Sequence, residues 1–465
     1  MRTTKGKTQT TNLARELARY AFLLKYEDLP QVTVQETKKR IVDGLGCAIG
    51  AFQEEPVKIA RKLGEAVQSS KPSTLLGTRT KTAVDLASFV NGIMVRYFDY
   101  NDTYLSKEPA HPSDNIGACL SVAESEKLSG KDFILALALA YEIQCRLCDA
   151  ADIRHRGWDH VCYGSVSTAL AAGKLMGLSE EQLTQAVNIS LNAHIAMRQV
   201  RAGELSMWKG ISFAEAGRNG VFSAMLAREG MTGPSPIFEG EMGFFKQVSG
   251  SFTLDTGSFG GRKGSFKIDG TIIKYFPAEI HSQTAIWASL EARKEIPNPD
   301  EILSVEIDSH EAGYTILGKD PEKWKPATKE TADHSLPYIV GKALLDGKID
   351  NSTYEERNFT DPKTLKFLQK ITVREFKGFT TKYPEAIANR ISVKLRSGKL
   401  ISKQVEYPKG HPKNPITKEE VEKKYRRLAG SYFSERQLDD TLGSLWNLEE
   451  AKDLSRLTAS FLVAK

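Results

Sequence analysis

Apolar side chains return at every third or fourth position along most of the first 260 residues. This spacing predicts helices over 14–23, 33–51 and 131–151, and a further helix that begins near Asn115. It also continues into a segment that carries Asp99, in which VDLASFVNGIMVRYFDYND has apolar residues on one helical face. The first half of the chain is therefore expected to be helical.

The pattern changes between about residues 265 and 410. Alternating apolar and polar positions in ILSVEIDSH, LQKITVREF and ISVKLRSGKLISKQVEY predict strands, and Ser397-Gly398 marks a tight turn between two of them. KETADHSLPYIVGKALLDG, which lies between these strands, has helical spacing. From Thr417 to the end the pattern is again helical.

This order predicts a mainly α protein, in which a large all-α helical domain is formed by both chain ends and a smaller α+β lid domain is inserted. The expected limits are 1–265 for the first part of the helical domain, 266–412 for the lid and 413–465 for the C-terminal part. Ligand pockets often form between domains, so the interface is the expected place for a site.

Charge and composition narrow the classes of partner. The 465 residues carry a formal charge of +6, with basic and acidic residues interleaved, so nucleic-acid binding is not expected. No apolar run is long enough to span a bilayer. The basic N-terminus lacks the apolar core of a secretory signal, and the five cysteines fit reduced thiols; both indicate a cytoplasmic protein, with a mitochondrial presequence as the alternative.

The stretch 96–114, RYFDYNDTYLSKEPAHPSD, holds the densest set of reactive side chains. Asp99 and Thr103 are expected to share a helix face as an i,i+4 pair, and His111 to lie just before the next helix. There the helix dipole favours a neutral imidazole and attracts an anion. The alternative is that the acids are helix caps and His111 is a surface loop residue.

Two further segments contain candidate site residues. Lys209 lies beside Trp208 and before an Ala- and Gly-rich helix, a setting that suits a carboxylate contact. The polar break DIRHRGWDHVCYG contains His155 and His160 on either side of Trp158-Asp159, and these histidines either line a site or belong to a solvated connector.

Five motifs, read together, resemble one family. They are DYNDTYLSKEPAHPSDNIGA, RGWDHVCYGSVS, KYFPAEIHSQTA, KETADHSLPYIV and YPKGHPKNP. This combination is similar to the MmgE/PrpD family, which contains 2-methylcitrate dehydratase, cis-aconitate decarboxylase and an iminodisuccinate epimerase. The resemblance implies a homodimer, catalysis without a metal or organic cofactor, and active-site residues at the matching motif positions: Asp99, Thr103, His111, Lys209, Lys274, His281 and Tyr338.

The lid motif favours the dehydratase branch. The decarboxylase type carries its lid histidine in a PAH arrangement, whereas this chain has Glu279 there and His281 two places on. The resemblance thus implies dehydration of 2-methylcitrate, or of a citrate-like tricarboxylate, in propionate catabolism through the methylcitrate cycle. Decarboxylation of cis-aconitate, epimerisation next to a carboxylate, and a non-catalytic binding protein are the alternatives.

The implied roles follow from the chemistry of dehydration. His111 is expected to be the principal acid or base, oriented by Asp99, with His281 or Tyr338 as its counterpart across the cleft. Lys209 and Lys274 are expected to clamp carboxylates, and Thr103 to donate a hydrogen bond to one of them. Which histidine is the acid and which is the base stays open.

Overall fold

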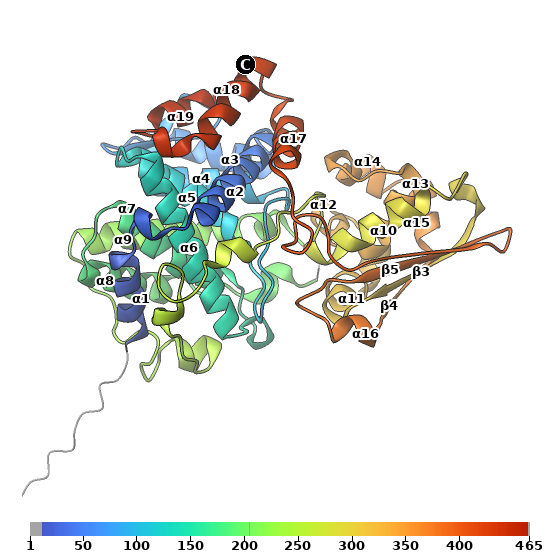
Figure 1. The fold of residues 1–465 in the computed structure, drawn as a ribbon, viewed down its shortest axis with the longest axis horizontal. Helices are drawn as coiled ribbons and strands as arrows, with labels where there is room; N and C mark the ends of the chain where they lie inside the picture. Colours follow the sequence, from blue (N-terminus) through green and yellow to red (C-terminus); the bar gives the residue numbers. More distant parts are fainter. Residues whose placement is uncertain (1–11, 204, 464–465) are drawn as a thin grey trace, which may run out of the picture.

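The computed structural model describes residues 12–203 and 205–463, arranged as a large helical body beside a smaller body that carries the main sheet (Figure 1). The basic N-terminal segment that was considered as a presequence lies almost entirely outside the described residues. The fold class is confirmed, since helices dominate and strands are confined to two small sheets. Within the described residues, no helix combines the length and the apolar character that crossing a membrane requires.

Both ends of the chain build the helical body. Its N-terminal helices are α1 (Leu13–Leu23), α2 (Gln31–Gly50), α3 (Glu55–Glu65), α4 (Val84–Arg96), α5 (Ile116–Ser125), α6 (Gly130–Ala150), α7 (Val161–Leu175), α8 (Glu180–Ala193) and α9 (Ser212–Arg228). A two-stranded antiparallel sheet joins β1 (Pro72–Thr74) to β2 (Lys81–Ala83). The C-terminal helices are α17 (Lys418–Ala429), α18 (Glu435–Trp446) and α19 (Ser455–Ser460), and α17 packs against α2 (Figure 1).

Local signals explain where several of these helices begin. Ser129, Ser179 and Thr417 each cap a helix start, and the third helical residue bonds back to the cap, so α6, α8 and α17 all open on a capping box. One hydrophobic core then joins residues between Leu13 and Ile273 to residues between Ile416 and Phe461.

The lid contains four strands, β3 (Ile302–Ser309), β4 (Ile371–Glu375), β5 (Asn389–Leu395) and β6 (Leu400–Val405), and seven helices among the described residues: α10 (Gln283–Arg293), α11 (Glu311–Leu317), α12 (Lys329–Ala332), α13 (Leu336–Asp346), α14 (Glu356–Phe359), α15 (Pro362–Leu368) and α16 (Lys377–Thr380). Strand order is β4-β3-β5-β6, with β3 and β4 parallel and the other pairs antiparallel. Gly398 has φ +89° in the β5–β6 turn, as the Ser-Gly signal predicted.

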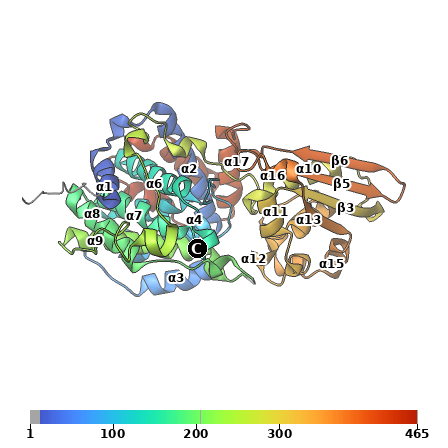
Figure 2. The ribbon, with the colours of Figure 1, turned by 90° about the horizontal axis from the view of Figure 1, so that it is seen from below.

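The lid has its own core, which begins at Phe276 and includes Ile307 of β3 and Ile391 of β5, paired across the sheet. Helices α10 and α13 pack on each other, and α10 also packs against β5 and β6. Figure 2 shows the lid projecting from one side of the helical body. The precise domain limits of 1–265, 266–412 and 413–465 stay a prediction.

Two predicted helices end earlier than their apolar spacing suggested. Helix α4 ends at Arg96, so Asp99 and Thr103 are not an i,i+4 pair, and Asp99 has φ +49°. The segment 329–347 forms two helices, α12 and α13, because Pro337 in the first turn of α13 cannot continue a helix from the preceding residues. At both interruptions the chain forms a turn, and these turns carry residues of the site described below.

Candidate active site

A pocket lies where the helical body meets the lid. Its polar lining is rich in histidine and in basic residues, drawn from both bodies. From the helical body come Arg96, Asp99, Thr103, His111, His160, Arg198, Arg201 and Lys209, and from the lid come Glu279, His281, Lys323 and His334. The pocket therefore offers several cations and four imidazoles to an anionic ligand.

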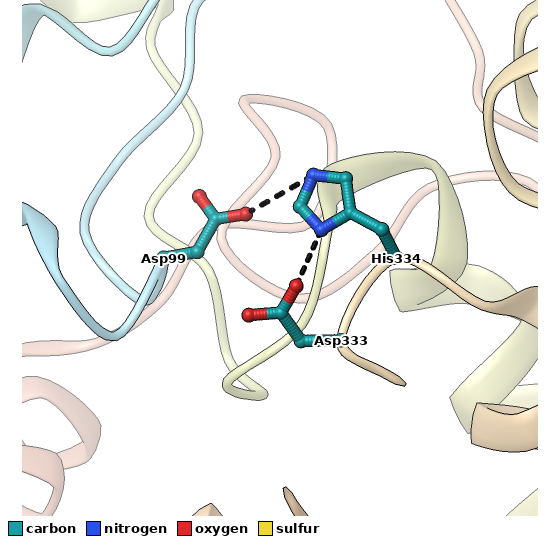
Figure 3. Close-up of side chains that lie close together, drawn as sticks. All are labelled: Asp99, Asp333 and His334. Carbon is teal, nitrogen blue, oxygen red and sulfur yellow. Dashed lines mark hydrogen bonds and ion pairs between the residues drawn. The ribbon is translucent and has the colours of Figure 1, made fainter. Parts of the chain in front are cut away.

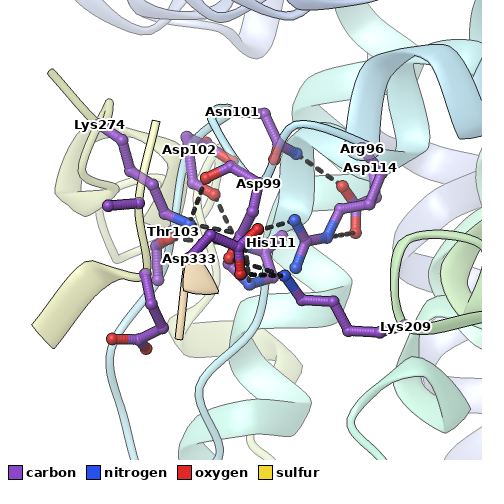
Figure 4. A network of polar contacts seen from close by, with 12 residues as sticks. Arg96, Asp99, Asn101, Asp102, Thr103, His111, Asp114, Lys209, Lys274 and Asp333 are labelled. Carbon is purple, nitrogen blue, oxygen red and sulfur yellow. Dashed lines mark hydrogen bonds and ion pairs between the residues drawn. The ribbon is translucent and has the colours of Figure 1, made fainter. Parts of the chain in front are cut away.

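Asp99 is the centre of a buried charge cluster (Figure 4). Its carboxylate accepts from the guanidinium of Arg96, from Lys209 Nζ at 3.3 Å and from Lys274 Nζ at 2.7 Å. All four side chains are at most 2% exposed. Lys274 Nζ also donates to the Asp99 carbonyl at 2.8 Å, so one lysine holds both the side chain and the backbone of Asp99.

The three cations fix the charge of Asp99. Burial acts to raise the pKa of its carboxyl group, but Arg96, Lys209 and Lys274 together lower that pKa well below the ordinary value. Asp99 therefore remains a carboxylate at neutral pH, and its role is to hold the cations in place. The left-handed backbone at Asp99, which aspartate tolerates better than most residues, directs this carboxylate toward them.

His111 is held by backbone and hydroxyl groups on one side of its ring. Nδ1 lies 2.8 Å from the Asp102 carbonyl and 3.1 Å from Thr103 Oγ1. Because a carbonyl oxygen only accepts, we assign the proton to Nδ1, which leaves the Nε2 lone pair available. Nε2 lies 3.9 Å from Asp99 Oδ1, too far for a hydrogen bond, so Asp102 and not Asp99 orients the ring.

The surroundings of His111 favour its neutral form. Burial is the main cause, and the positive charges of Arg96 and Lys274 add to it, so that the pKa of His111 falls well below 6.5 despite the opposing charge of Asp99. A neutral imidazole with a free lone pair can accept a proton near neutral pH.

The loop between α4 and α5 is stabilised by its own polar residues. Asp102 Oδ1 accepts from the Ser113 amide at 3.0 Å, and Oδ2 accepts from the Tyr141 hydroxyl at 2.8 Å. Thr103 pairs with Ile272 through two backbone hydrogen bonds of 2.8 Å, which ties this loop to the segment that carries Lys274. His111 lies directly before the short turn Pro112–Asn115, which leads into α5, so its place ahead of the next helix is as the sequence predicted.

His160 lies in the pocket beside His111, with ring centroids 5.8 Å apart. Arg201 donates to its Nε2 at 2.9 Å, and Arg201 in turn binds the buried carboxylate of Asp159 at 2.6 Å. Burial, together with Arg201, lowers the pKa of His160 to about 3 despite the opposing charge of Asp159. The polar break left open by the sequence thus supplies a neutral histidine whose Nδ1 is buried and has no hydrogen-bond partner within the described residues.

On the lid, His281 has a carboxylate partner. Its Nδ1 lies 2.7 Å from Glu279 Oε1, and its backbone amide donates to Glu279 Oε2 at 2.7 Å. Its other ring nitrogen lies 3.4 Å from the Tyr383 hydroxyl. Although burial opposes it, the interaction with His281 and its hydrogen bond lower the pKa of Glu279 to about 2, so Glu279 is a carboxylate.

Asp333 and His334 lie at the break between α12 and α13, where His334 lines the pocket and contacts both Asp99 and Asp333 (Figure 3). The two carboxylates and the imidazole lie close enough together to bind one metal ion. Lys209 Nζ, however, lies 3.3 Å from Asp99 Oδ2 and 3.4 Å from Asp333 Oδ1, and therefore already supplies a positive charge between the two carboxylates. Together with Arg96 and Lys274 it makes this donor set unfavourable for a further cation.

The structure brings six of the seven predicted residues into one cluster. Asp99, Thr103, His111, Lys209 and His281 line the pocket, and Lys274 lies behind Asp99 with its ammonium fully buried. Tyr338 is separate, because its hydroxyl donates to the Thr353 carbonyl inside the lid core. The remaining polar residues of the lining were not indicated by the sequence pattern: Arg96, Arg198, Arg201, Lys323 and His334.

The sequence holds a signal for two of these residues. His334 lies in the same motif as Tyr338, four residues earlier, and Arg96 begins the stretch that contains Asp99. Nothing in the local pattern distinguishes Lys323, Arg198 or Arg201 from solvated basic residues. Their place in the lining depends on contacts between distant segments.

Comparison of the sequence with known proteins identifies two family domains and several relatives. Residues 15–256 match the MmgE/PrpD N-terminal domain, and residues 276–448 match the MmgE/PrpD C-terminal domain. The chain is 29% identical over 419 residues to 2-methylcitrate dehydratase of Escherichia coli K12, covering 84% of each chain.

More distant relatives include two eukaryotic proteins. The mitochondrial 2-methylcitrate dehydratase of Yarrowia lipolytica is 27% identical over 477 residues, covering 95% of this chain and 88% of that one. Human cis-aconitate decarboxylase is 26% identical over 455 residues, covering 94% and 91%. With both domain matches spanning most of its length, the chain belongs to the MmgE/PrpD family.

Proposed function

We propose that this protein dehydrates 2-methylcitrate, or a closely related citrate-like hydroxy-tricarboxylate, by general acid–base catalysis without a cofactor. The observation that carries the proposal is the contrast between two histidines of one pocket. His111 is neutral among cations, whereas His281 is paired with the Glu279 carboxylate. Two histidines in such different surroundings, one among cations and one against a carboxylate, are suited to act as base and acid.

The proposed reaction uses this contrast directly. His111 Nε2 accepts the proton from the carbon next to a substrate carboxylate, while Glu279 stabilises the imidazolium form of His281. That imidazolium gives its proton to the departing hydroxyl group, so the carbon–oxygen bond breaks and water leaves. Proton exchange with solvent then restores both histidines.

Cations around the pocket supply the binding energy in this proposal. Lys209, Arg198, Arg201 and Lys323 line it and are placed to bind substrate carboxylates. Negative charge that develops on the carboxylate next to the reacting carbon is stabilised by such fixed cations. Lys274 acts through Asp99, since its ammonium already donates to that residue twice. The homodimer and the cytoplasmic location stay predictions.

Product analysis separates this reaction from the others of the family. The purified protein is incubated with 2-methylcitrate, citrate or cis-aconitate, and products are followed by proton NMR and by release of carbon dioxide. The proposal expects 2-methyl-cis-aconitate or cis-aconitate from the hydroxy acids and no carbon dioxide. Release of carbon dioxide from cis-aconitate, without dehydration of the hydroxy acids, would instead support decarboxylation, the activity named for the human relative.

The lowered pKa of His111 predicts that activity persists at lower pH than it would with an ordinary histidine as the base. A base acts in its unprotonated form, so a pKa below 6.5 keeps it active at lower pH. We expect kcat/KM for 2-methylcitrate not to fall as the pH is lowered from about 7 to about 6. A twofold loss already near pH 6.5, measured in buffers of constant ionic strength, would mean that the base has an ordinary pKa.

The position of Tyr338 predicts a small effect of its removal. Tyr338→Phe deletes one buried hydrogen bond to the Thr353 carbonyl, so the free energy of unfolding should fall by about 1 kcal/mol. The value of kcat should not change, because the side chain does not line the pocket. His281→Asn, measured in parallel, should lower kcat strongly; a comparable loss in both variants would place Tyr338 in the chemistry after all.

A further inference from the structure

A buried lysine outside the pocket contacts the two segments that carry the charge cluster. Lys424 of α17 lies with its Nζ 2.6 Å from Oδ1 of Asp43 on α2, and both side chains are nearly inaccessible. The same ammonium donates to the Tyr100 carbonyl at 2.6 Å and to the Lys274 carbonyl at 2.9 Å. The ammonium therefore joins three distant parts of the chain, through one ion pair and two hydrogen bonds.

The two carbonyls belong to segments that carry the charge cluster around Asp99. Tyr100 follows Asp99 directly, and Lys274 is the residue whose side chain binds the Asp99 carboxylate at 2.7 Å. Lys424 thus connects the backbones of two segments that Lys274 connects through its side chain. A shift of either backbone would change the distance between Lys274 Nζ and Asp99.

Neighbouring contacts strengthen the same junction. The Lys424 ammonium lies 3.7 Å from the centre of the Tyr100 ring, and the Tyr100 hydroxyl donates to the Tyr275 carbonyl at 2.5 Å. Arg427, one helical turn after Lys424, donates to that hydroxyl. Tyr275 directly precedes Phe276, where the lid core begins, so α17 holds the chain at the point where it leaves the helical body.

We propose that Lys424 is a positioning residue of the active site: its ammonium fixes the Tyr100 and Lys274 backbones and thereby sets the contact between Lys274 and Asp99. The ion pair with Asp43 and the two carbonyl contacts together offset the cost of burying this ammonium. The inference rests on the proposed function only for its kinetic readout.

The variants Lys424→Met, Asp43→Asn and Asp43→Asn/Lys424→Met separate positioning from charge burial. Lys424→Met leaves the Asp43 carboxylate buried and unpaired, so both melting temperature and kcat should fall. The double variant removes both charges, so the melting temperature should recover toward that of the wild type. Its kcat should remain about 10- to 100-fold low, with KM changed by less than about threefold, since displacement of catalytic groups mainly affects turnover.

Asp43→Asn is the matched control, since it keeps the ammonium and both of its carbonyl contacts. We expect it to lose less than about fivefold in kcat. Recovery of kcat together with stability in the double variant would overturn the proposal, as would a loss in Asp43→Asn equal to that in Lys424→Met.

An NMR titration gives a readout that does not need turnover. His111 faces Arg96, Asp99, Lys274 and His160, and the charge of Lys274 helps to lower its pKa. If Lys274 moves away in the double variant, the pKa of His111 should rise, whereas Asp43→Asn should leave it unchanged. An unchanged pKa in the double variant would contradict the positioning role. Absence of wild-type turnover with 2-methylcitrate would contradict the proposed function alone.

Discussion

His111→Ala should lose about 10²- to 10⁴-fold in kcat for dehydration of 2-methylcitrate, the contribution that general acid–base groups typically make. The imidazole is the base in the proposed reaction, and its Nδ1 is held by the Asp102 carbonyl so that Nε2 is free. None of the other imidazoles in the pocket has the same arrangement. His160 accepts from Arg201, and the Nδ1 of His334 contacts Asp333.

The fold should survive this change. The His111 side chain is 13% exposed and makes no ion pair shorter than 3.9 Å, so its removal leaves no buried charge without a partner. His155→Ala is the control, because that side chain is 75% exposed and does not line the pocket. Steady-state kinetics and circular dichroism on both variants test the role. If His111→Ala kept more than about a tenth of wild-type turnover, another group would be the base.

Asp99→Ala should destabilise the protein by about 3–5 kcal/mol, which is the usual cost of removing one partner from a buried ion pair. The change would leave Arg96, Lys209 and Lys274 close together, each at most 2% exposed, without their common carboxylate. Activity should fall as well, because mutual repulsion would displace Lys209 from the pocket lining. Urea unfolding followed by fluorescence measures the loss.

A surface carboxylate provides the matched comparison. Asp439 pairs with Arg426 on the exposed side of the C-terminal helices, and both side chains are more than one-third accessible. Asp439→Ala should cost less than about 1 kcal/mol, as exposed ion pairs do. Equal losses in the two variants would mean that the charge cluster around Asp99 contributes no more than an ordinary surface contact.

Hydrophobic periodicity predicted the architecture because it depends on local sequence. The buried face of α1 and the alternating β5–β6 hairpin carry their pattern within one element, and capping residues such as Ser129 mark several helix starts. The same patterns were wrong at Arg96 and at Asp333. There an apolar face continues in the sequence, while the chain turns so that polar side chains can enter the pocket.

The site was predicted only as far as its motifs reached. Asp99, Thr103 and His111 lie within thirteen residues of one another, so a single stretch indicated them. Tyr338 was placed in the site by motif position, but α13 begins at Leu336 with Ser335 as its cap, and this start turns Tyr338 into the lid core. The local sequence does not indicate whether Tyr338 faces the lid core or the pocket.

Contacts between distant segments of the chain determine the features that local sequence does not predict. Lys209 meets Asp333 across 124 residues, and Lys424 meets Tyr100 across 324. The local pattern of Lys424 does not differ from that of a solvated surface residue, and the pattern around Lys209 indicates a carboxylate contact but not its partner. Their burial becomes visible only when the helical body and the lid are both in place, since each charge is paired by a group from another part of the chain.

The most direct test of the central claim is a continuous ultraviolet assay of the purified protein with 2-methylcitrate after treatment with a strong chelator. The absorbance reports the new double bond conjugated to a carboxylate. We expect formation of 2-methyl-cis-aconitate at the same rate with and without chelator, because the side chains of the pocket supply base, acid and cations. Loss of the rate in chelator and its return on addition of iron would contradict the account.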